Sequence, residues 1–181
     1  RAPSTQSARR RIVASMRPSQ FALTTFQWNM HTHYHTAGSL KLSEIVHRNP
    51  ILMNRATGHE LGLESGDVLE VISRTGIVRG EVLLVQGIHP RVVAISDNCG
   101  HWGYGHVARG KPFKSANPET KLLWWEKEGN GTHVKPLIAA RTDRAGGGVA
   151  WQDTVVSVLK VASKPRPSFV EKYLFFFGGD A

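Results

Sequence analysis

The sequence predicts a mainly β protein, built as a closed β-barrel with short helices and long loops. The pattern contains about six or seven short apolar, β-branched runs and one clear helical segment. Eighteen Gly and nine Pro residues supply the turns that such a fold needs. No Gly-x-Gly-x-x-Gly segment follows a strand and opens a helix, so a Rossmann-type dinucleotide site is not indicated.

The predicted strands are short apolar segments bounded by turn residues; they are residues 21–26, 50–53, 67–73, 77–85, 91–96 and 153–161. The second hairpin strand follows Arg74-Thr75-Gly76, where we expect Gly76 to have a positive φ. Residues 42–46 predict a short helical turn, and residues 97–114 form a long loop that lacks clear periodicity. Long loops in compact domains are often functional.

Residues 54–71 predict a helix, a tight turn and a strand in succession. Asn54 can cap the helix, and Gly62 can end it in a left-handed conformation. Gly66-Asp67 is a turn signal, and Val68 opens an apolar strand. This arrangement resembles the helix, Gly-Asp turn and strand of double-psi β-barrels, so we expect that barrel type.

The chain has the length of one domain, and it is strongly basic. We assign residues 1–19 to a linker or extension, 20–162 to the barrel and 163–181 to a C-terminal tail. The formal charge of +9 favours an anionic partner, or a larger assembly that balances it. No segment is long and apolar enough to span a membrane, and the lack of an initiator Met leads us to interpret the chain as part of a longer protein.

The single cysteine, Cys99, excludes an internal disulfide and an iron–sulfur cluster ligated from within this chain. We expect it to be a small buried residue at a strand end. His31, His33 and His35 would share one face of an extended chain, and imidazole is a common metal ligand. Zinc or iron binding is one hypothesis for this run. The alternative is a polar loop of hydrogen-bonding imidazoles, which fits an anion-binding loop equally well.

The order of these segments resembles the C-terminal molybdopterin-guanine-dinucleotide (MGD) binding domain of the DMSO reductase family. In that family a Leu-x-Thr strand leads into an Arg-x-x-x-His-x-His-Thr run that wraps the pterin and the pyrophosphate. Here residues 22–25 lead into a run that ends in His33-Tyr34-His35-Thr36. Imidazole, hydroxyl and backbone N–H groups are suitable hydrogen-bond donors to the pterin and to the pyrophosphate. Gln27 or Trp28 stands where the family usually has Arg.

Two later segments carry the resemblance further. Gly100-His101-Trp102, with His106 after it, matches the Gly-His-Trp that many family members place after this strand; the same residues also make structural sense as turn glycines and aromatic lids. Residues 129–137 resemble the family's Gly-x-Asn-x-Asn-x-Leu loop, with His133 and Lys135 at the Asn positions. The cofactor-binding residues that the resemblance implies are Thr25, Gln27, Trp28, His31, His33, His35, Thr36, His101, Trp102, His106, Asn130, His133 and Lys135.

The resemblance implies a cofactor-binding domain in the catalytic subunit of a molybdenum or tungsten bis-MGD oxidoreductase. The catalytic metal ligand would lie upstream, and no residue here is assigned to the chemical step. The Gly-His-Trp run points to sulfur or arsenic oxyanions or polysulfide as substrates. Expected partners are the rest of the catalytic subunit, an iron–sulfur subunit and a membrane anchor subunit. We expect a membrane-associated complex on the periplasmic or extracytoplasmic side.

Three alternatives stay open. The absent Arg and the substituted Lys135 favour a cofactor-free structural homologue within a respiratory complex. The His-rich run favours a standalone His-liganded metalloenzyme on a β-barrel. A basic nucleic-acid-binding barrel is the least favoured, because the basic residues are not interleaved with a stacking array of aromatics, and we expect no nucleic-acid partner.

Overall fold

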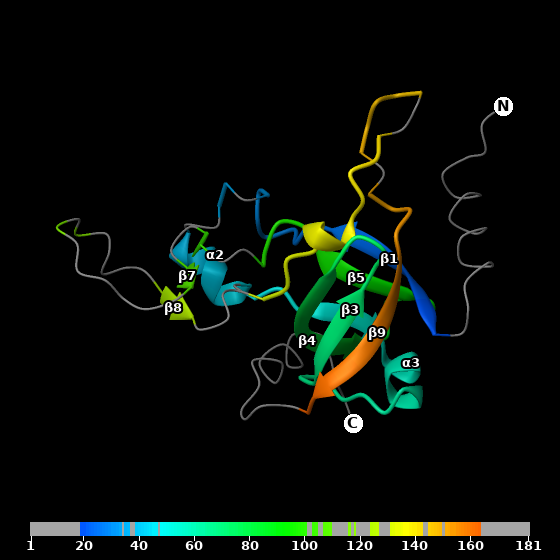
Figure 1. Cartoon of the computed structure of the whole chain (residues 1–181). Helices are drawn as coiled ribbons and strands as arrows, with labels where there is room; N and C mark the ends of the chain where they lie inside the picture. The colour runs from blue at the N-terminus through cyan, green and yellow to red at the C-terminus, as the bar shows by residue number, and fades with distance from the viewer. Residues whose placement is uncertain are drawn as a thin grey trace.

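Six strands close into a barrel in the order β1–β5–β2–β4–β3–β9 (Figure 1). Their bounds are Gln20–Phe26 for β1, Ile51–Asn54 for β2, Val68–Ile72 for β3, Ile77–Val85 for β4, Val92–Ser96 for β5 and Val155–Ala162 for β9. This computed structural model describes residues 19–33, 35–36, 39–46, 48–100, 103–104, 107–109, 116, 118, 124–126, 131–142, 145–149 and 151–163. The predicted linker and tail, residues 1–19 and 163–181, lie almost wholly outside that set, and the predicted domain bounds stay predictions.

The strand pairing is that of the predicted double-psi β-barrel. β1 runs parallel to β5 and β2 runs parallel to β4, while the other neighbours pair antiparallel. Parallel neighbours cannot be joined by a tight hairpin, so the chain must cross between strands. The mainly β class, the closed barrel and the short helices are therefore confirmed.

The barrel interior is filled by alternate residues of every strand. Leu69 and Val71 of β3 face inward and are fully buried, which is the period-two pattern expected of a strand with one solvent face. β2, β4 and β5 instead have consecutive buried residues. Their outer face forms a second cluster in which Trp28 and Val46 cover Leu52 and other outward side chains. β2, β5 and the second half of β4 are therefore mainly apolar because both of their faces are buried.

The predicted helix, turn and strand are present after β2. Helix α3 spans Arg55–Glu60, and the Asn54 side chain accepts a hydrogen bond from the Thr57 N–H at 3.2 Å. Gly62 and Gly66 have φ values of 68° and 95°, in the left-handed region where glycine is favoured. The predicted cap, helix end and Gly-Asp turn are all confirmed.

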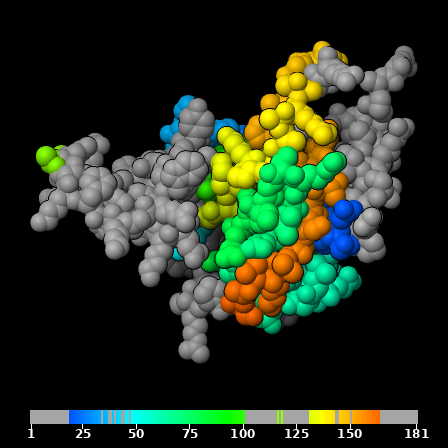
Figure 2. All heavy atoms as spheres, in the orientation of Figure 1, coloured from blue at the N-terminus to red at the C-terminus, as the bar shows by residue number. Residues whose placement is uncertain are grey.

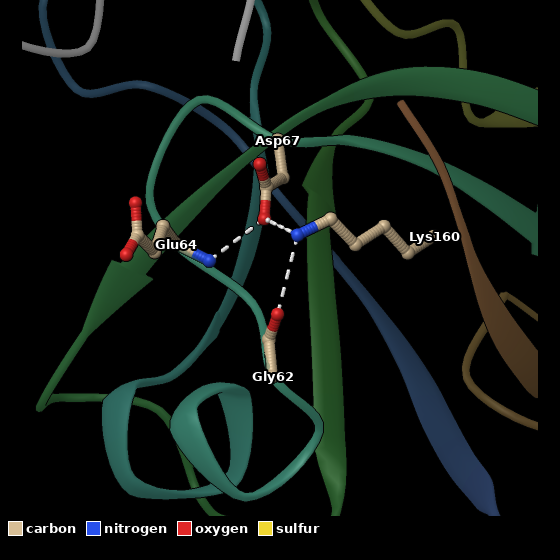
Figure 3. A network of polar contacts seen from close by, with 4 residues as sticks. All are labelled: Gly62, Glu64, Asp67 and Lys160. Atoms are coloured by element: carbon tan, nitrogen blue, oxygen red, sulfur yellow. Dashed lines mark hydrogen bonds and ion pairs between the residues drawn. The ribbon is translucent and has the colours of Figure 1, made fainter. Parts of the chain in front are cut away.

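A buried carboxylate ties this turn to the last strand of the barrel. Figure 3 shows Lys160 of β9 beside Asp67, with Nζ 2.7 Å from Oδ2. The same oxygen accepts the Glu64 N–H at 2.8 Å, and Lys160 also donates to the Gly62 carbonyl at 3.2 Å. Asp67 is almost fully buried and Lys160 about one-third exposed. We call these four residues the Asp67 clasp.

The β3–β4 hairpin is confirmed, but the expectation for Gly76 was wrong. Gly76 is not among the described residues with a positive φ. Glycine fits there because a Cβ would lie 2.6 Å from the Pro136 carbonyl oxygen, closer than real Cβ contacts allow. The close approach of a distant segment determines this position.

A smaller lobe lies beside the barrel, on the left of Figure 1. It contains helix α2 (Leu40–Ile45) and a three-stranded sheet of β6 (Gly103–Tyr104), β7 (Val107–Arg109) and β8 (Trp124–Glu126). Part of the predicted 97–114 loop is therefore a strand pair. The helical turn η2 covers Lys135–Leu137. Among the described residues no helix is long and apolar enough to cross a membrane.

Candidate functional site

The candidate site lies at the end of the barrel where β1 and β5 finish together. Phe26 pairs with Ser96 in parallel register, and the Asp97 N–H donates to the Phe26 carbonyl at 3.0 Å. β2 runs antiparallel to β5, so the segment that leads into β2 arrives at the same end. Strand direction therefore brings the loops after β1, after β5 and before β2 together.

Asn49, in the segment before β2, joins the β5 loop to the 131–134 segment through one side chain. Its Nδ2 donates to the carbonyl oxygens of Ser96 and Thr132, both at 2.7 Å, and lies 3.4 Å from that of Cys99. The Asn49 carbonyl in turn accepts the Thr132 N–H at 2.9 Å. Asn49 is buried, so these bonds are sheltered from water and hold the 131–134 segment against the β5 loop.

Two glycines permit this close contact. Gly131 has φ 106°, and a Cβ there would lie 2.3 Å from the Asn49 nitrogen. Gly100 has φ 86°, and a Cβ would lie 2.0 Å from the Thr132 carbonyl oxygen. Both positions therefore require glycine, for conformation and for space.

Several buried polar atoms at this end have no hydrogen-bond partner within the described part of the chain. They are Asn49 Oδ1, Asp97 Oδ1, Asn98 Nδ2 and Thr132 Oγ1. Such groups cost free energy when they stay unpaired, so native proteins normally provide a partner for each. The set contains two acceptors, one donor and one hydroxyl, which matches a ligand with mixed polar edges.

The His-rich run does not form the predicted shared face. Residues 29–33 and 35–36 form turns instead of an extended strand, and His33 has a left-handed φ of 49°. His31 is buried, with its ring nitrogens 2.9 Å from the Val46 carbonyl and 3.2 Å from Thr36 Oγ1, whereas His35 is exposed. The expectation of three imidazoles projecting together was wrong, because local turns override the alternation of an extended chain. His31 anchors the loop to the end of α2.

The other predicted residues of this loop have different surroundings. Thr25 accepts a hydrogen bond from Gln152 at 3.1 Å, and Gln27 is exposed. Trp28 is buried in the second core cluster, packs edge-on to Phe26 and donates its backbone N–H toward Asn98 Oδ1 at 3.5 Å. Thr36 Oγ1 accepts the Thr32 N–H at 2.9 Å. The structure therefore gives Trp28 and His31 clear packing roles.

The later predicted residues divide into two groups. His133 is half-buried beside Thr132, and Lys135 is exposed at the start of η2. Both follow the Asn49 contact directly, so they belong to the same end of the barrel. His101, Trp102, His106 and Asn130 lie outside the described residues, and their assignment stays a prediction.

Sequence reasoning missed Asn49, Asp97, Asn98 and Thr132. The Asn49-Pro50 pair is a turn signal, but turn signals carry no information about the distant loops that Asn49 contacts. Cys99 is buried as expected, and burial, aided by the nearby Asp97 carboxylate, raises its pKa to about 12. The thiol is therefore neutral near pH 7. In the described part of the chain, no group of three or more His, Cys, Asp or Glu residues could hold a metal ion.

Comparison with known proteins determines the family. Residues 21–154 match the family model described as Molydopterin dinucleotide binding domain. The chain belongs to this family. The matched residues of this molybdopterin dinucleotide-binding domain include the β1 loop, the β5 loop and the 131–137 segment. The family assignment therefore covers the candidate site.

Two curated proteins resemble this binding domain over part of their length. A selenate reductase subunit of Mesobacillus selenatarsenatis is 29% identical over 135 residues, covering 62% of this chain and 12% of that protein. The arsenate respiratory reductase molybdopterin-containing subunit ArrA of a Shewanella species is 29% identical over 114 residues, covering 63% of this chain and 11% of that protein. This domain therefore spans only about an eighth of the length of these relatives.

A solved structure shares the fold. Acetylene hydratase from Pelobacter acetylenicus superposes with a TM-score of 0.55 at 15% sequence identity, covering 78% of this chain and 18% of that one. At this identity the likeness concerns the fold alone. It agrees with the closed barrel.

Proposed function

We propose that this domain holds part of a molybdenum or tungsten bis-MGD cofactor in the catalytic subunit of an oxidoreductase. The observation that carries the proposal is the convergence of the β1 loop, the β5 loop and the 131–134 segment at one end of the barrel. There the Asp97 N–H donates to the Phe26 carbonyl, and Asn49 donates to the Ser96 and Thr132 carbonyls. The family resemblance associates these three segments with the cofactor, although they are far apart in sequence. The family match covers all three.

The polar groups at this end fit such a ligand. Asn98 Nδ2 and Thr132 Oγ1 can donate to phosphate or carbonyl oxygens, and Asp97 Oδ1 and Asn49 Oδ1 can accept from ring N–H or amino groups. The exposed ammonium of Lys135 supplies the positive charge that the absent Arg would otherwise provide. When bound, the metal cofactor would supply two-electron chemistry coupled to oxygen-atom or proton transfer. This chain's residues would bind and orient it.

We further propose an oxyanion of arsenic or selenium as the substrate class of the whole enzyme. The support is the similarity to one subunit of a selenate reductase and to one of an arsenate respiratory reductase. Sulfur oxyanions and polysulfide, which the Gly-His-Trp run suggests, are the competing substrate classes. Reduction of arsenate, selenate, tetrathionate and polysulfide by the purified enzyme with a viologen donor separates them. Turnover of sulfur compounds alone would overturn this assignment.

The enzyme would work as part of a complex. We propose the rest of the catalytic subunit, an iron–sulfur subunit and a membrane anchor as partners, on the extracytoplasmic side of a membrane. Both curated relatives are named as single subunits of reductases, which supports a multi-subunit arrangement. Purification of the native complex followed by mass spectrometry, together with protease protection in spheroplasts, tests both statements.

The decisive experiment measures the cofactor in the complete catalytic subunit. We expect molybdenum or tungsten with about two GMP released per metal on acid treatment, since the cofactor carries the redox chemistry and the protein holds it. Replacing Asn98 with Leu should lower the retained nucleotide while the subunit stays folded. Asn54→Ala is the matched control, because Asn54 caps α3 away from the three loops. Full nucleotide retention in Asn98→Leu would remove Asn98 from the site.

A cofactor-free homologue is the second candidate. The residues that favour it are His133 and Lys135, which replace the two asparagines of the family pattern, and the absent Arg near Gln27. Purified complex without nucleotide or stoichiometric metal would establish this alternative. Zinc or iron that tracks the chain without nucleotide would instead support the His-liganded metalloenzyme.

A further inference from the structure

A groove of about 490 Å³ lies beside the β3–β4 hairpin and borders the 131–137 segment of the candidate site through Leu137. Its lining includes Gln20, at the opposite end of β1 from Phe26, where the site loop begins. The residues that define it are Arg74, Thr75, Leu137, Arg141, Asp153 and Val155. We call it the hairpin groove. Figure 2 shows the segments around it, the green hairpin, the yellow 131–142 segment and orange β9, next to one another on the viewed face.

The walls of the hairpin groove are fixed by contacts between distant segments. Thr75 Oγ1 donates to the Leu137 carbonyl at 2.8 Å and lies 3.2 Å from that of Pro136. Gly76 packs directly on Pro136. On the other side β9 is paired with both β3 and β1, and the Leu23 N–H donates to the Thr154 carbonyl at 2.8 Å. The groove is therefore a preformed surface, which lowers the cost of binding.

The charges in the hairpin groove are unbalanced. Arg74 and Arg141 are exposed, and neither forms an ion pair within the described part of the chain. Asp153 is the single carboxylate among the lining residues, and Leu137, Ala139 and Val155 supply an apolar floor. Guanidinium groups beside apolar surface favour a carboxylate carried on a partly apolar segment, because Arg binds carboxylates with two parallel hydrogen bonds.

We propose that the hairpin groove docks an acidic segment from the rest of the same catalytic polypeptide. This inference depends on the proposed function, in which the domain is part of a longer subunit. The relatives are long enough to supply that segment, since this chain matches only 12% and 11% of their lengths. The formal charge of +9 on this chain calls for acidic neighbours. The docked segment would lock the domain onto the subunit at the hairpin, next to the 131–137 segment.

Site-specific photo-crosslinking in the complete catalytic subunit tests the proposal. Benzoylphenylalanine is incorporated in place of Arg74, and the cross-linked peptides are identified by mass spectrometry. We expect one predominant product, which joins the hairpin to an Asp- or Glu-rich segment outside residues 1–181. The same probe in place of Glu60, exposed on α3, is the matched control and should not capture that segment.

Charge reversal provides the second measurement. With the photoprobe in place of Thr75, the Arg74→Glu and Arg141→Glu substitutions together should abolish the cross-link, and changing the captured acidic residue to Lys should restore it. Arg55→Glu on α3 is the matched surface control and should leave it intact. Capture of a different subunit, no product above the Glu60 control, or a cross-link that survives the double reversal would each overturn the proposal. Nucleotide content measured on the same samples separates this failure from failure of the proposed function.

Discussion

At the scale of single residues, Asn49 connects parts of the candidate site that are remote in sequence. Its amide contacts carbonyls of the β5 loop and of the 131–134 segment, and its own carbonyl returns a bond to Thr132. A carboxamide can donate two hydrogen bonds and accept two, so one buried side chain can serve several backbone groups. The family resemblance points to the loops, and Asn49 determines how they lie relative to each other.

Replacing Asn49 with Ala should therefore destabilise the domain. The Ser96 and Thr132 carbonyls would lose their buried donor, at about 2–4 kcal/mol in the free energy of unfolding. Urea unfolding of the 181-residue chain measures this change. Asn54→Ala, which removes the α3 cap and a part-buried hydrogen bond to the Ile88 carbonyl, should cost less, about 1–2 kcal/mol. Equal losses for the two variants would contradict the role given to Asn49.

Three glycines allow space and backbone conformation to be separated. Gly100→Ala combines a positive φ with a clash against the Thr132 carbonyl, so we expect a loss of more than about 2 kcal/mol. Gly62→Ala keeps the positive φ but has open space, and should cost about 1 kcal/mol. Gly87→Ala has neither problem and should lie within about 0.5 kcal/mol of the parent. Thermal unfolding of the series tests the order, and a destabilised Gly87→Ala would contradict it.

Cys99 should make stability depend on pH in the alkaline range. Burial, with the Asp97 charge second, raises its pKa from 9.0 to about 12 in the folded chain. The contribution of the neutral thiol is fully present below pH 9 and is lost as pH rises from 9 towards 12, because only the unfolded chain ionises there. Stability should fall by about 1.4 kcal/mol per pH unit in this window. Cys99→Ala should remove this pH dependence. The free energy of unfolding of the parent and of the variant is measured at about pH 8 and about pH 10.5, and the change in the difference between the two proteins isolates the contribution of Cys99.

At the scale of elements, the Asp67 clasp fastens the α3 turn to β9, which closes the barrel. Lys160 donates to Asp67 and to Gly62, so it bridges the two ends of the Gly-Asp turn segment (Figure 3). Asp67 is buried, while Lys160 keeps contact with water. Removing Lys160 and removing Asp67 should therefore change the free energy of unfolding by different amounts.

Lys160→Met should cost about 2 kcal/mol, more than a surface ion pair provides, because the buried Asp67 carboxylate loses its ammonium partner. Arg79→Met is the matched control, since it removes an exposed ion pair with Glu70 and should cost less than about 1 kcal/mol. Chemical denaturation of both variants gives the comparison. When the Asp67→Asn variant is the starting protein, Lys160→Met should lower the free energy of unfolding by less, because no buried charge is left unpaired. An unchanged effect would argue against the clasp.

At the scale of the whole molecule, the barrel brings together segments that the sequence separates. The site loops meet because β1 and β5 are parallel and end in register, and the hairpin groove forms because β9 pairs with both β3 and β1. One closed sheet therefore presents two different surfaces. The loop end suits a cofactor, and the hairpin side suits a partner segment, which is consistent with a domain that works inside a larger subunit.

The sequence by itself determined the features that depend on neighbouring residues. The Asn54 cap, the left-handed Gly62, the Gly-Asp turn and the strand at β3 follow from local conformational preferences, and each was predicted. The order of motifs was also enough to indicate the family. Residue type and spacing carry this information without any knowledge of distant contacts.

Only the tertiary structure decided which side chains serve the site. The alternation of side chains in an extended strand predicted that His31, His33 and His35 lie on one face. The segment instead forms turns, in which His31 is buried and bonded to the Val46 carbonyl while His35 is exposed. Asn49 contacts Thr132 from 83 positions away, and Gly76 is needed because Pro136 lies against it. Such contacts exist only after the barrel has closed, because closure sets the register that brings remote segments together.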